Sequence, residues 1–217
     1  MEEYSQAMGS SESIVITKAS SSDLAAMEDI CIKTADQGHN PLPERAFPQF
    51  LPAIWLTPYM TETRDATCLV AREAAHREHV VGYCISAWDA ESFERNLRMA
   101  WYPKVRAHYA ERMDDFTKAD RALWNIMSRP ATFSGDWVKR YPAETHIDIL
   151  SEGRGFGLGR RLIESMEKEL QRHGVRGFHL GVDPLNTNAQ AFYEHLGLEL
   201  LVPVSAGGPT YGRVLQE

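Results

Sequence analysis

The chain has 217 residues, of which 43% are hydrophobic and 24% are charged, so it is long enough to bury one sizeable core. Its formal net charge of −7 argues against a nucleic-acid-binding protein, because such proteins are usually basic. No apolar run approaches the length of a membrane span and no signal peptide begins the chain, so we expect no membrane partner and a location in the cytoplasm or, for a eukaryotic protein, the nucleus. We also expect a monomer or a homodimer.

The N-terminus predicts a tail followed by a strand. Residues 1–12 are polar, rich in serine and aperiodic, which is typical of a flexible tail ahead of a single domain over residues 13–217. The β-branched run Ile14–Ile16 predicts the first strand. Three cysteines are expected to be free thiols in a reducing compartment, because they are odd in number and lack metal-ligand spacing: Cys31, Cys68 and Cys84.

Two helical regions follow this strand. Apolar residues at helical spacing predict a helix from Asp23 to about Thr34, and either Ser21 or Ser22 is suited to cap it. A second region, near Phe47–Met60, contains three prolines. Because proline removes a helical hydrogen bond, we expect this region to be broken into turns.

The next pattern is a hairpin. Thr67–Arg72 and His79–Trp88 predict two strands joined by a charged turn. Gly82 lies inside the second strand, which predicts a bulge or a close approach of another backbone segment.

A long helical segment, residues 89–143, separates this hairpin from the next strand and contains three predicted helices, Glu91–Met99, Lys104–Met113 and Lys118–Ser128. A structured insertion of this length is typical of a lid or binding element. The alternative is a helical addition that extends the core, and the tryptophans concentrated here suit either role.

A strand, a glycine-rich turn and a helix come next. Thr145–Leu150 alternates as a half-buried strand does, and apolar residues from Leu158 mark a helix that Gly174 is placed to end. Between them, Ser151–Gly159 has a glycine at every second position from Gly153. A helix N-terminus offers unpaired N–H groups and a positive dipole, and glycine lets the backbone approach a ligand, so this turn predicts an anion site.

Two common phosphate-binding patterns do not fit this turn. A P-loop needs lysine after its last glycine, but Arg160 follows Gly159, and the Rossmann pattern lacks its third glycine. What fits is Arg154–Gly159, read as (Gln/Arg)-x-x-G-x-(G/A). With this pattern the chain resembles the GNAT family of acetyl-CoA-dependent N-acetyltransferases, in which the turn holds the pyrophosphate of coenzyme A. The alternative is a glycine-rich connection that binds nothing.

A second segment is similar to the other signature of that family. Arg176–Val182 predicts a strand, and Asn186 follows it with Ala189 three residues later. An aromatic pair that ends in Tyr193 precedes Gly197 and an apolar residue. Asn186 can cap this helix and Gly197 can end it in the left-handed conformation.

The resemblance implies an α/β fold with a mixed, mostly antiparallel sheet that splays between the strands beginning at Thr145 and Arg176. Helices would cover both faces, and Leu198–Val204 and Tyr211–Leu215 would be the last two strands. The implied activity is direct transfer of an acetyl group from acetyl-CoA, the cosubstrate, to a primary amine. Residues 89–143 make the chain similar to the subset related to the acetyltransferase-like domain of O-GlcNAcase.

Two other functions stay open. One is a catalytically inactive module that binds acyl-CoA, and the other is transfer to a hydroxyl group or of a longer acyl chain. The parts of the chemistry are a base for the ammonium proton, a backbone N–H for the oxyanion and an acid for the departing thiolate. By resemblance Tyr193 is that acid, and its phenol is protonated at neutral pH.

The base has four candidates. Glu144, His146 and Asp148 lie at a spacing of two, so they share one face of a strand. Asp148 is preferred because it is closest to the splayed strand end, while Glu144 is closest to where relatives place a glutamate base, and His146 has the most suitable intrinsic pKa. Asp183, at the end of the neighbouring strand, is the fourth.

The resemblance also implies binding residues. The segment 47–60 forms one wall of the acceptor cleft in the family, so Phe50, Trp55 and Tyr59 are candidates to line it, although aromatic residues more often belong to the core. No metal ligands are predicted. The residues carried over to acetyl-CoA are Ile149, Leu150, Arg154, Gly155, Phe156, Gly157, Leu158, Gly159, Arg160, Asn186 and Tyr193.

Overall fold

A computed structural model describes residues 14–38, 44–130, 137–155, 157–203, 205 and 208–215. The tail predicted at residues 1–12 and the predicted cofactor residue Phe156 lie outside these ranges. Among the described helices, none is both long and apolar enough to cross a membrane.

A seven-stranded sheet runs through the described part of the chain in the order β1-β2-β3-β4-β5-β7-β6. All neighbours are antiparallel except β4 and β5, which confirms the predicted mixed, mostly antiparallel sheet. Each predicted strand is present within a few residues of its expected bounds. The strands are β1 Ile14–Lys18, β2 Ala66–Glu73, β3 Val80–Ala87, β4 Ala143–Ile149, β5 Gly177–Gly181, β6 Glu199–Val202 and β7 Thr210–Val214.

The sheet opens at its parallel pair, as predicted. β4 and β5 are in register only at Ala143 with Phe178 and at Glu144 with His179. β4 continues to Ile149, and along that length its recorded sheet partner is β3. The two strands therefore diverge towards their carboxyl ends, which leaves one edge of β4 for another binding partner.

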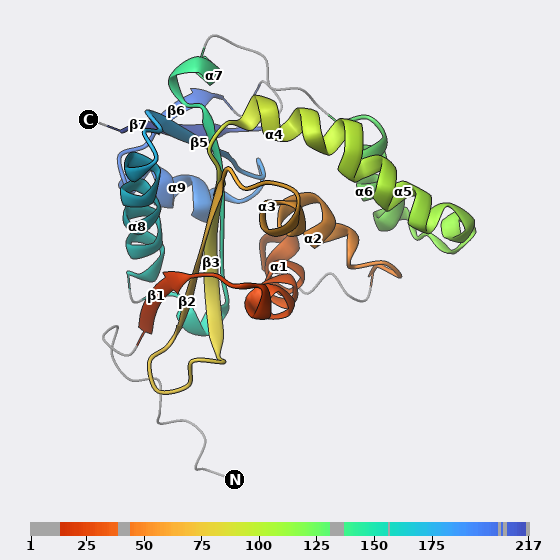
Figure 1. Cartoon of the computed structure of the whole chain (residues 1–217), viewed down its shortest axis with the longest axis horizontal. Coiled ribbons are helices and arrows are strands. Elements are labelled where there is room, and N and C mark those ends of the chain that lie inside the picture. The colour runs from red at the N-terminus through yellow and green to blue at the C-terminus, as the bar shows by residue number, and fades with distance from the viewer. Residues whose placement is uncertain are drawn as a thin grey trace.

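Helices cover both faces of the sheet, each with its own core (Figure 1). α8, Leu158–Arg172, and α9, Thr187–His195, pack on one face. On the other face lie the N-terminal helices and the insertion, which share the second core. These N-terminal helices are α1 Leu24–Gly38, α2 Phe50–Trp55 and α3 Thr57–Thr61, and a short helix, α7 Trp137–Arg140, precedes β4.

The structure confirms one local prediction in the N-terminal region and corrects another. The region of the three prolines is broken as expected, because α2 and α3 are separate helices that meet at Leu56. The predicted cap of α1 was wrong by one or two positions. A 3-10 turn, η2 Ser21–Asp23, precedes α1, and the backbone N–H of Ser20 donates to Asp23 Oδ2 at 2.8 Å.

The close backbone approach predicted at Gly82 is present. The β2–β3 register shifts between Ala71 and Arg72, opposite Gly82, which marks a bulge. A Cβ atom on Gly82 would lie 2.9 Å from the carbonyl oxygen of Asp148. Glycine is therefore needed here for β3 to lie against β4.

The insertion begins with one continuous helical stretch where the sequence predicted two helices. α4 Ala90–Asn96 passes through a π-turn, η4 Leu97–Trp101, directly into α5 Tyr102–Tyr109. Pro103 explains the π-turn, because it has no N–H to donate to the carbonyl of Met99 four residues earlier. A 3-10 turn, η5 Ala110–Asp115, then leads to α6 Lys118–Ser128, whose predicted bounds are confirmed.

Asp120 joins the insertion to the α2 region. It is fully buried and caps α6 together with Thr117, whose backbone N–H donates to Asp120 Oδ2 at 2.9 Å. It also accepts hydrogen bonds from the backbone N–H groups of Ala46 at 3.0 Å and Phe47 at 3.2 Å. Burial acts to raise the pKa of Asp120, but these hydrogen bonds outweigh it and hold that pKa below its ordinary value.

We expect Asp120→Ala to lower the free energy of unfolding by about 2–4 kcal/mol, because it removes a helix cap and leaves the Phe47 N–H buried without an acceptor. Urea unfolding measures this loss. Asp89→Ala is the matched control: Asp89 caps α4 through Ser92 but is exposed, so its loss should cost only about 1 kcal/mol. Equal losses in the free energy of unfolding for the two variants would contradict the role of Asp120 in joining the insertion to the α2 region.

Candidate functional site

The glycine-rich turn lies between the end of β4 and the start of α8. After a short 3-10 turn, η6 Ser151–Gly153, the backbone takes positive φ values of 85° at Gly155 and 69° at Gly157, which caps α8. Among the described residues, no atom lies within 4 Å of a Cβ built on either glycine. The turn thus presents the unpaired N–H groups of the helix start on an open surface, as an anion site requires.

The other two glycines of this turn serve packing. A Cβ on Gly153 would lie 2.9 Å from Ile149 Cγ2, and one on Gly159 would lie 2.8 Å from the ring of Phe192. Gly159 therefore lets α9 approach the first turn of α8. Leu158 is buried in the core, so only its backbone is available to a ligand.

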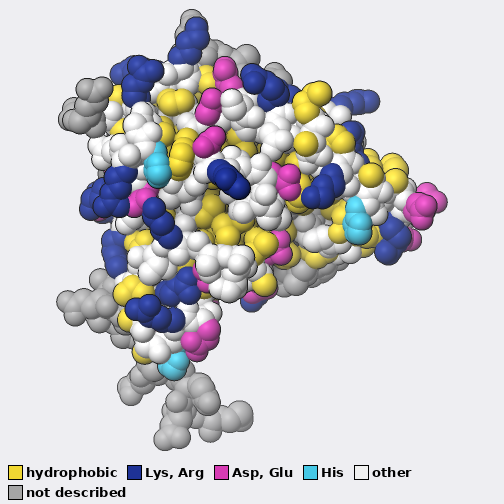
Figure 2. Space-filling model, viewed as in Figure 1, with side chains coloured by type: hydrophobic (Ala, Val, Ile, Leu, Met, Phe, Trp, Pro, Cys, Tyr) yellow, Lys and Arg dark blue, Asp and Glu magenta, His cyan; other side chains and the backbone are white. Residues whose placement is uncertain are grey.

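Positive charge surrounds the turn. Arg154 is exposed and its Nε donates to the carbonyl oxygen of Ile149 at 3.1 Å, while Arg160 is 3.7 Å from Glu164 in an exposed ion pair. Basic side chains gather on the side of the molecule where α8 lies (Figure 2). A cavity of about 240 Å³ adjoins the turn and is lined by Lys33, Thr34, Leu150, Ser151, Glu152 and Arg154.

Asn186, Gly197 and Asp183, at or near the ends of α9, have structural roles. The side-chain oxygen of Asn186 accepts from the N–H of Ala189 at 3.0 Å, which confirms the predicted cap, and Gly197 ends the helix region with φ of 79°. Asp183 is exposed and its Oδ1 accepts from the N–H of Leu185 at 2.8 Å. Asp183 is therefore placed in a surface turn.

Tyr193 lies in the core beneath the diverging strands. It is buried with Leu162, Phe178 and Tyr211, and its ring centroid is 5.8 Å from that of Tyr211. Burial raises the pKa of Tyr193, so its phenol is protonated at neutral pH. No hydrogen bond of this hydroxyl is recorded within the described ranges.

Glu144, His146 and Asp148 share one face of β4, as their spacing predicted, and Tyr83 lies opposite Asp148 on β3. Glu144 Oε1 lies 3.4 Å from His146 Nε2. The ring of Tyr59 packs edge-on against His146 with a centroid distance of 5.6 Å. The row formed by Glu144, His146 and Asp148 therefore begins with a carboxylate–imidazole pair that the ring of Tyr59 contacts.

The two carboxyl groups of this row differ in pKa. Burial acts to raise the pKa of Glu144, but the hydrogen bond and charge of His146, with His179 and Tyr59, outweigh it and lower the pKa below its ordinary value. For Asp148, burial prevails and raises the pKa, although the Tyr83 hydroxyl donates to Asp148 Oδ2. At neutral pH Glu144 is thus the more firmly ionised of the two.

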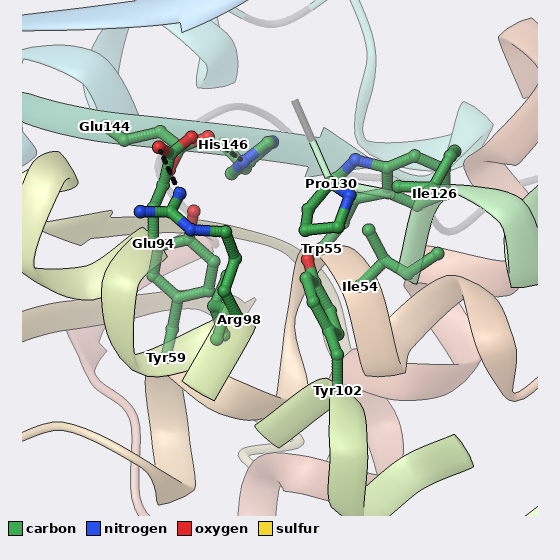
Figure 3. Close-up of a pocket in the computed structure, with 11 residues that line it drawn as sticks. Ile54, Trp55, Tyr59, Glu94, Arg98, Tyr102, Ile126, Pro130, Glu144 and His146 are labelled. Carbon is green, nitrogen blue, oxygen red and sulfur yellow. Dashed lines mark hydrogen bonds and ion pairs between the residues drawn. The ribbon is translucent and has the colours of Figure 1, made fainter. Parts of the chain in front are cut away.

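A pocket of about 190 Å³ lies beside Glu144 and His146, between β4 and the inserted helices (Figure 3). Trp55 and Tyr59, two of the three predicted cleft residues, line it, whereas Phe50 is wholly buried in the core. Asp148 is not among the lining residues. The wall combines apolar and aromatic side chains with four Glu, Arg or His side chains, and comprises Ile54, Trp55, Tyr59, Glu94, Leu97, Arg98, Tyr102, Ile126, Pro130, Glu144 and His146.

The sequence reasoning missed the side of this pocket that the insertion supplies. Glu94, Arg98 and Tyr102 follow one another at a spacing of four, which places them on one helix face. That spacing was visible in the sequence, but it did not show which surface the face would meet. The insertion thus packs into the core and also lines the pocket.

Comparison with known proteins gives three kinds of match. The Acetyltransferase (GNAT) family profile matches residues 39–198. The L-amino acid N-acyltransferase MnaT of Escherichia coli (strain K12) is 23% identical over 157 residues, which are 70% of this chain and 86% of that protein. The crystal structure of SsHAT superposes with a TM-score of 0.81 at 31% identity, covering 94% of this chain and 100% of that one.

A fourth match shares the fold alone. The GNAT superfamily phosphinothricin acetyltransferase from Sinorhizobium meliloti, solved in complex with AcCoA, has a TM-score of 0.52 at 15% identity, covering 94% of this chain and 90% of that one.

Proposed function

The chain belongs to the acetyltransferase (GNAT) family, and we propose that it transfers the acetyl group of acetyl-CoA directly to a primary amine held in the pocket of Figure 3. The observation that carries this proposal is the alignment of three features along one strand. The open glycine turn follows β4, the divergence from β5 exposes its edge, and the pocket lies beside Glu144 near its start.

In this proposal the glycine-rich turn binds acetyl-CoA. The diphosphate would accept hydrogen bonds from the backbone N–H groups between Arg154 and Arg160, and these two cations would balance its charge. The thioester arm would then run along the free edge of β4 past Ile149. The carbonyl oxygen of Ile149 accepts a hydrogen bond from the Arg154 side chain in this structure. A backbone N–H of that edge would polarise the thioester carbonyl as the oxyanion forms.

Glu144 is the base that the geometry favours over Asp148, because Glu144 and its partner His146 line the pocket. The acceptor loses its ammonium proton to this pair, and its nitrogen lone pair then attacks the carbonyl carbon. The carbon–sulfur bond then breaks, and its electron pair goes to sulfur, which takes a proton from Tyr193. The second proton that the nitrogen loses as the amide forms passes through solvent to the tyrosinate and restores the phenol. Holding both substrates in one cleft provides much of the remaining rate enhancement.

The unpaired state of the three cysteine thiols supports the cytoplasm as the location of this reaction, because a reducing compartment keeps thiols free. Burial raises the pKa of each of the three thiols, which keeps them protonated. We therefore propose direct transfer without an acetylated cysteine.

A thermal-shift titration with acetyl-CoA tests the binding half of the proposal. At acetyl-CoA concentrations about 100 times Kd, the ligand should add about 2.7 kcal/mol to the free energy of unfolding. Release of free thiol with a panel of primary amines tests the transfer half. No stabilisation at millimolar acetyl-CoA would contradict the assignment, and stabilisation without thiol release for any amine would indicate an inactive acyl-CoA-binding module.

Gly157→Ala should abolish most of that stabilisation. The added methyl group strains the left-handed backbone, by about 1–2 kcal/mol, and projects over the turn where the diphosphate would lie. Gly174→Ala is the matched control, because Gly174 has φ of 71° and equally open surroundings at the other end of α8. Both variants should lose similar stability, but only Gly157→Ala should bind acetyl-CoA at least about tenfold more weakly, which is about 1.4 kcal/mol.

A further inference from the structure

Among the described residues that line the pocket, Arg98 is the one Lys or Arg side chain. It comes from the π-turn η4, and it extends from the insertion towards the part of the pocket that Glu144 and His146 line (Figure 3). Its side chain is 31% exposed, so the guanidinium group is accessible from the pocket. π-turns are often found where a helix presents a functional side chain.

The hydrogen-bonding capacity of Arg98 is mostly unused. Its one recorded ion pair in the described part of the chain joins Nη1 to Glu94 Oε2 at 3.4 Å, which is longer than a strong charge-assisted hydrogen bond. A guanidinium group has five N–H donors arranged to hold a carboxylate through two parallel bonds. The arginine can therefore bind an oxyanion from the pocket without breaking a strong contact.

The opposite charge lies on the same side of the pocket as Arg98 (Figure 3). Glu144 is ionised at neutral pH, because His146 and its other partners lower its pKa, and it faces the space that an acceptor ammonium group would enter. Away from these charged groups the wall is apolar and aromatic, with Ile54, Trp55 and Tyr102 (Figure 3). The pocket therefore complements a molecule with a cation, an anion and an apolar side chain.

We propose that the acceptor is a free α-amino acid with an apolar side chain, and that Arg98 binds its carboxylate. This inference rests on the acetyl transfer proposed above, because it identifies the acceptor of that reaction. The pocket volume of about 190 Å³ leaves room for a side chain of moderate size. A polyamine would bring a second cation towards Arg98, and a lysine side chain of a protein has no carboxylate beside its amine.

Three probes that differ only in the carboxylate test this role: leucine, leucinamide and 3-methylbutylamine. Isothermal titration of the protein with each probe measures binding directly, and thiol release with acetyl-CoA measures kcat and KM. Leucine should bind at least about tenfold more tightly than the other two, because only leucine offers a charged oxyanion to the guanidinium group.

Arg98→Met should remove this preference. We expect a loss of about 10- to 100-fold in leucine affinity and kcat/KM, mainly through KM, with little change for 3-methylbutylamine. Arg95→Met is the matched control, because Arg95 is on α4 but exposed and outside the pocket wall, and it should keep the wild-type preference.

The failure of this inference can be told apart from the failure of acetyl transfer. Equal binding of the three probes, a preference that survives in Arg98→Met, or no binding of leucine at millimolar concentration would overturn the role of Arg98, whatever acetyl-CoA does. Absence of thiol release together with an arginine-dependent preference for leucine would reject catalysis but keep the amino-acid site.

Discussion

Tyr193→Phe is expected to lower kcat by about 10²–10⁴-fold while acetyl-CoA binding stays unchanged. Phenylalanine keeps the ring that packs in the buried core with Phe178 and Tyr211, and removes only the hydroxyl group. Because burial raises the pKa of this phenol, it is protonated at neutral pH and has a proton to donate to the departing thiolate. Thiol-release kinetics measure the lost turnover, and the acetyl-CoA thermal shift shows that the cofactor site is intact.

Tyr211→Phe is the matched control for this experiment. Tyr211 is also buried, and its hydroxyl donates to Glu194 Oε1 at 3.0 Å, away from the reacting atoms. Its loss should cost about 1 kcal/mol of stability and leave kcat nearly unchanged. If Tyr193→Phe turns over as fast as Tyr211→Phe, another group or water must protonate the leaving thiolate.

Glu144→Gln should lower kcat/KM by about 100-fold or more near neutral pH, because the pocket loses the carboxylate that takes the ammonium proton. The loss should shrink as pH rises, since a growing share of the amine then arrives neutral. In the unmodified protein the lowered pKa of Glu144 keeps the carboxylate ionised throughout the range above its ordinary value. Its own titration should therefore not limit activity near neutrality, and kcat/KM profiles of both proteins check this.

Asp148→Asn separates the two carboxylates. It makes the same chemical change on the same face of β4, but at a residue that hydrogen-bonds to Tyr83 and does not line the pocket. We expect a smaller loss of activity than for Glu144→Gln. The reverse order would make Asp148 the base, as its position near the splayed strand end suggested, and a comparable loss in His146→Asn alone would give that role to the imidazole.

Local conformational preferences were enough to predict much of the fold from the sequence. Positive φ at Gly157 and Gly197, the Asn186 cap and the strand ending at Ile149 depend on conformational preferences that act within a few residues. For the same reason the conformation of the glycine-rich turn could be predicted without knowing which other segments surround it. The exceptions were also local: Ser20 begins the first helical segment instead of its neighbours, and Pro103 widens a helix without ending it.

Other features depend on surfaces that meet only when the chain folds. The sequence pattern predicted that Gly159 would contact a phosphate. The structure shows that a side chain at this position would collide with the ring of Phe192, which explains the glycine. Glu144 and Asp148 have equivalent positions in the strand pattern, and only the placement of the insertion puts one of them in the pocket wall. No sequence pattern distinguishes Arg98, because a charged residue on a helix is usually only solvated.

The sequence by itself determined the strand–turn–helix unit and its family and predicted an anion site, because glycine conformations and helix ends are decided by neighbouring residues. Only the tertiary structure decided which carboxylate lines the pocket and that Arg98 lines it too. Those relations join β4 to a helix more than forty residues earlier in the chain, and pairings of that kind arise from packing, which no local pattern records.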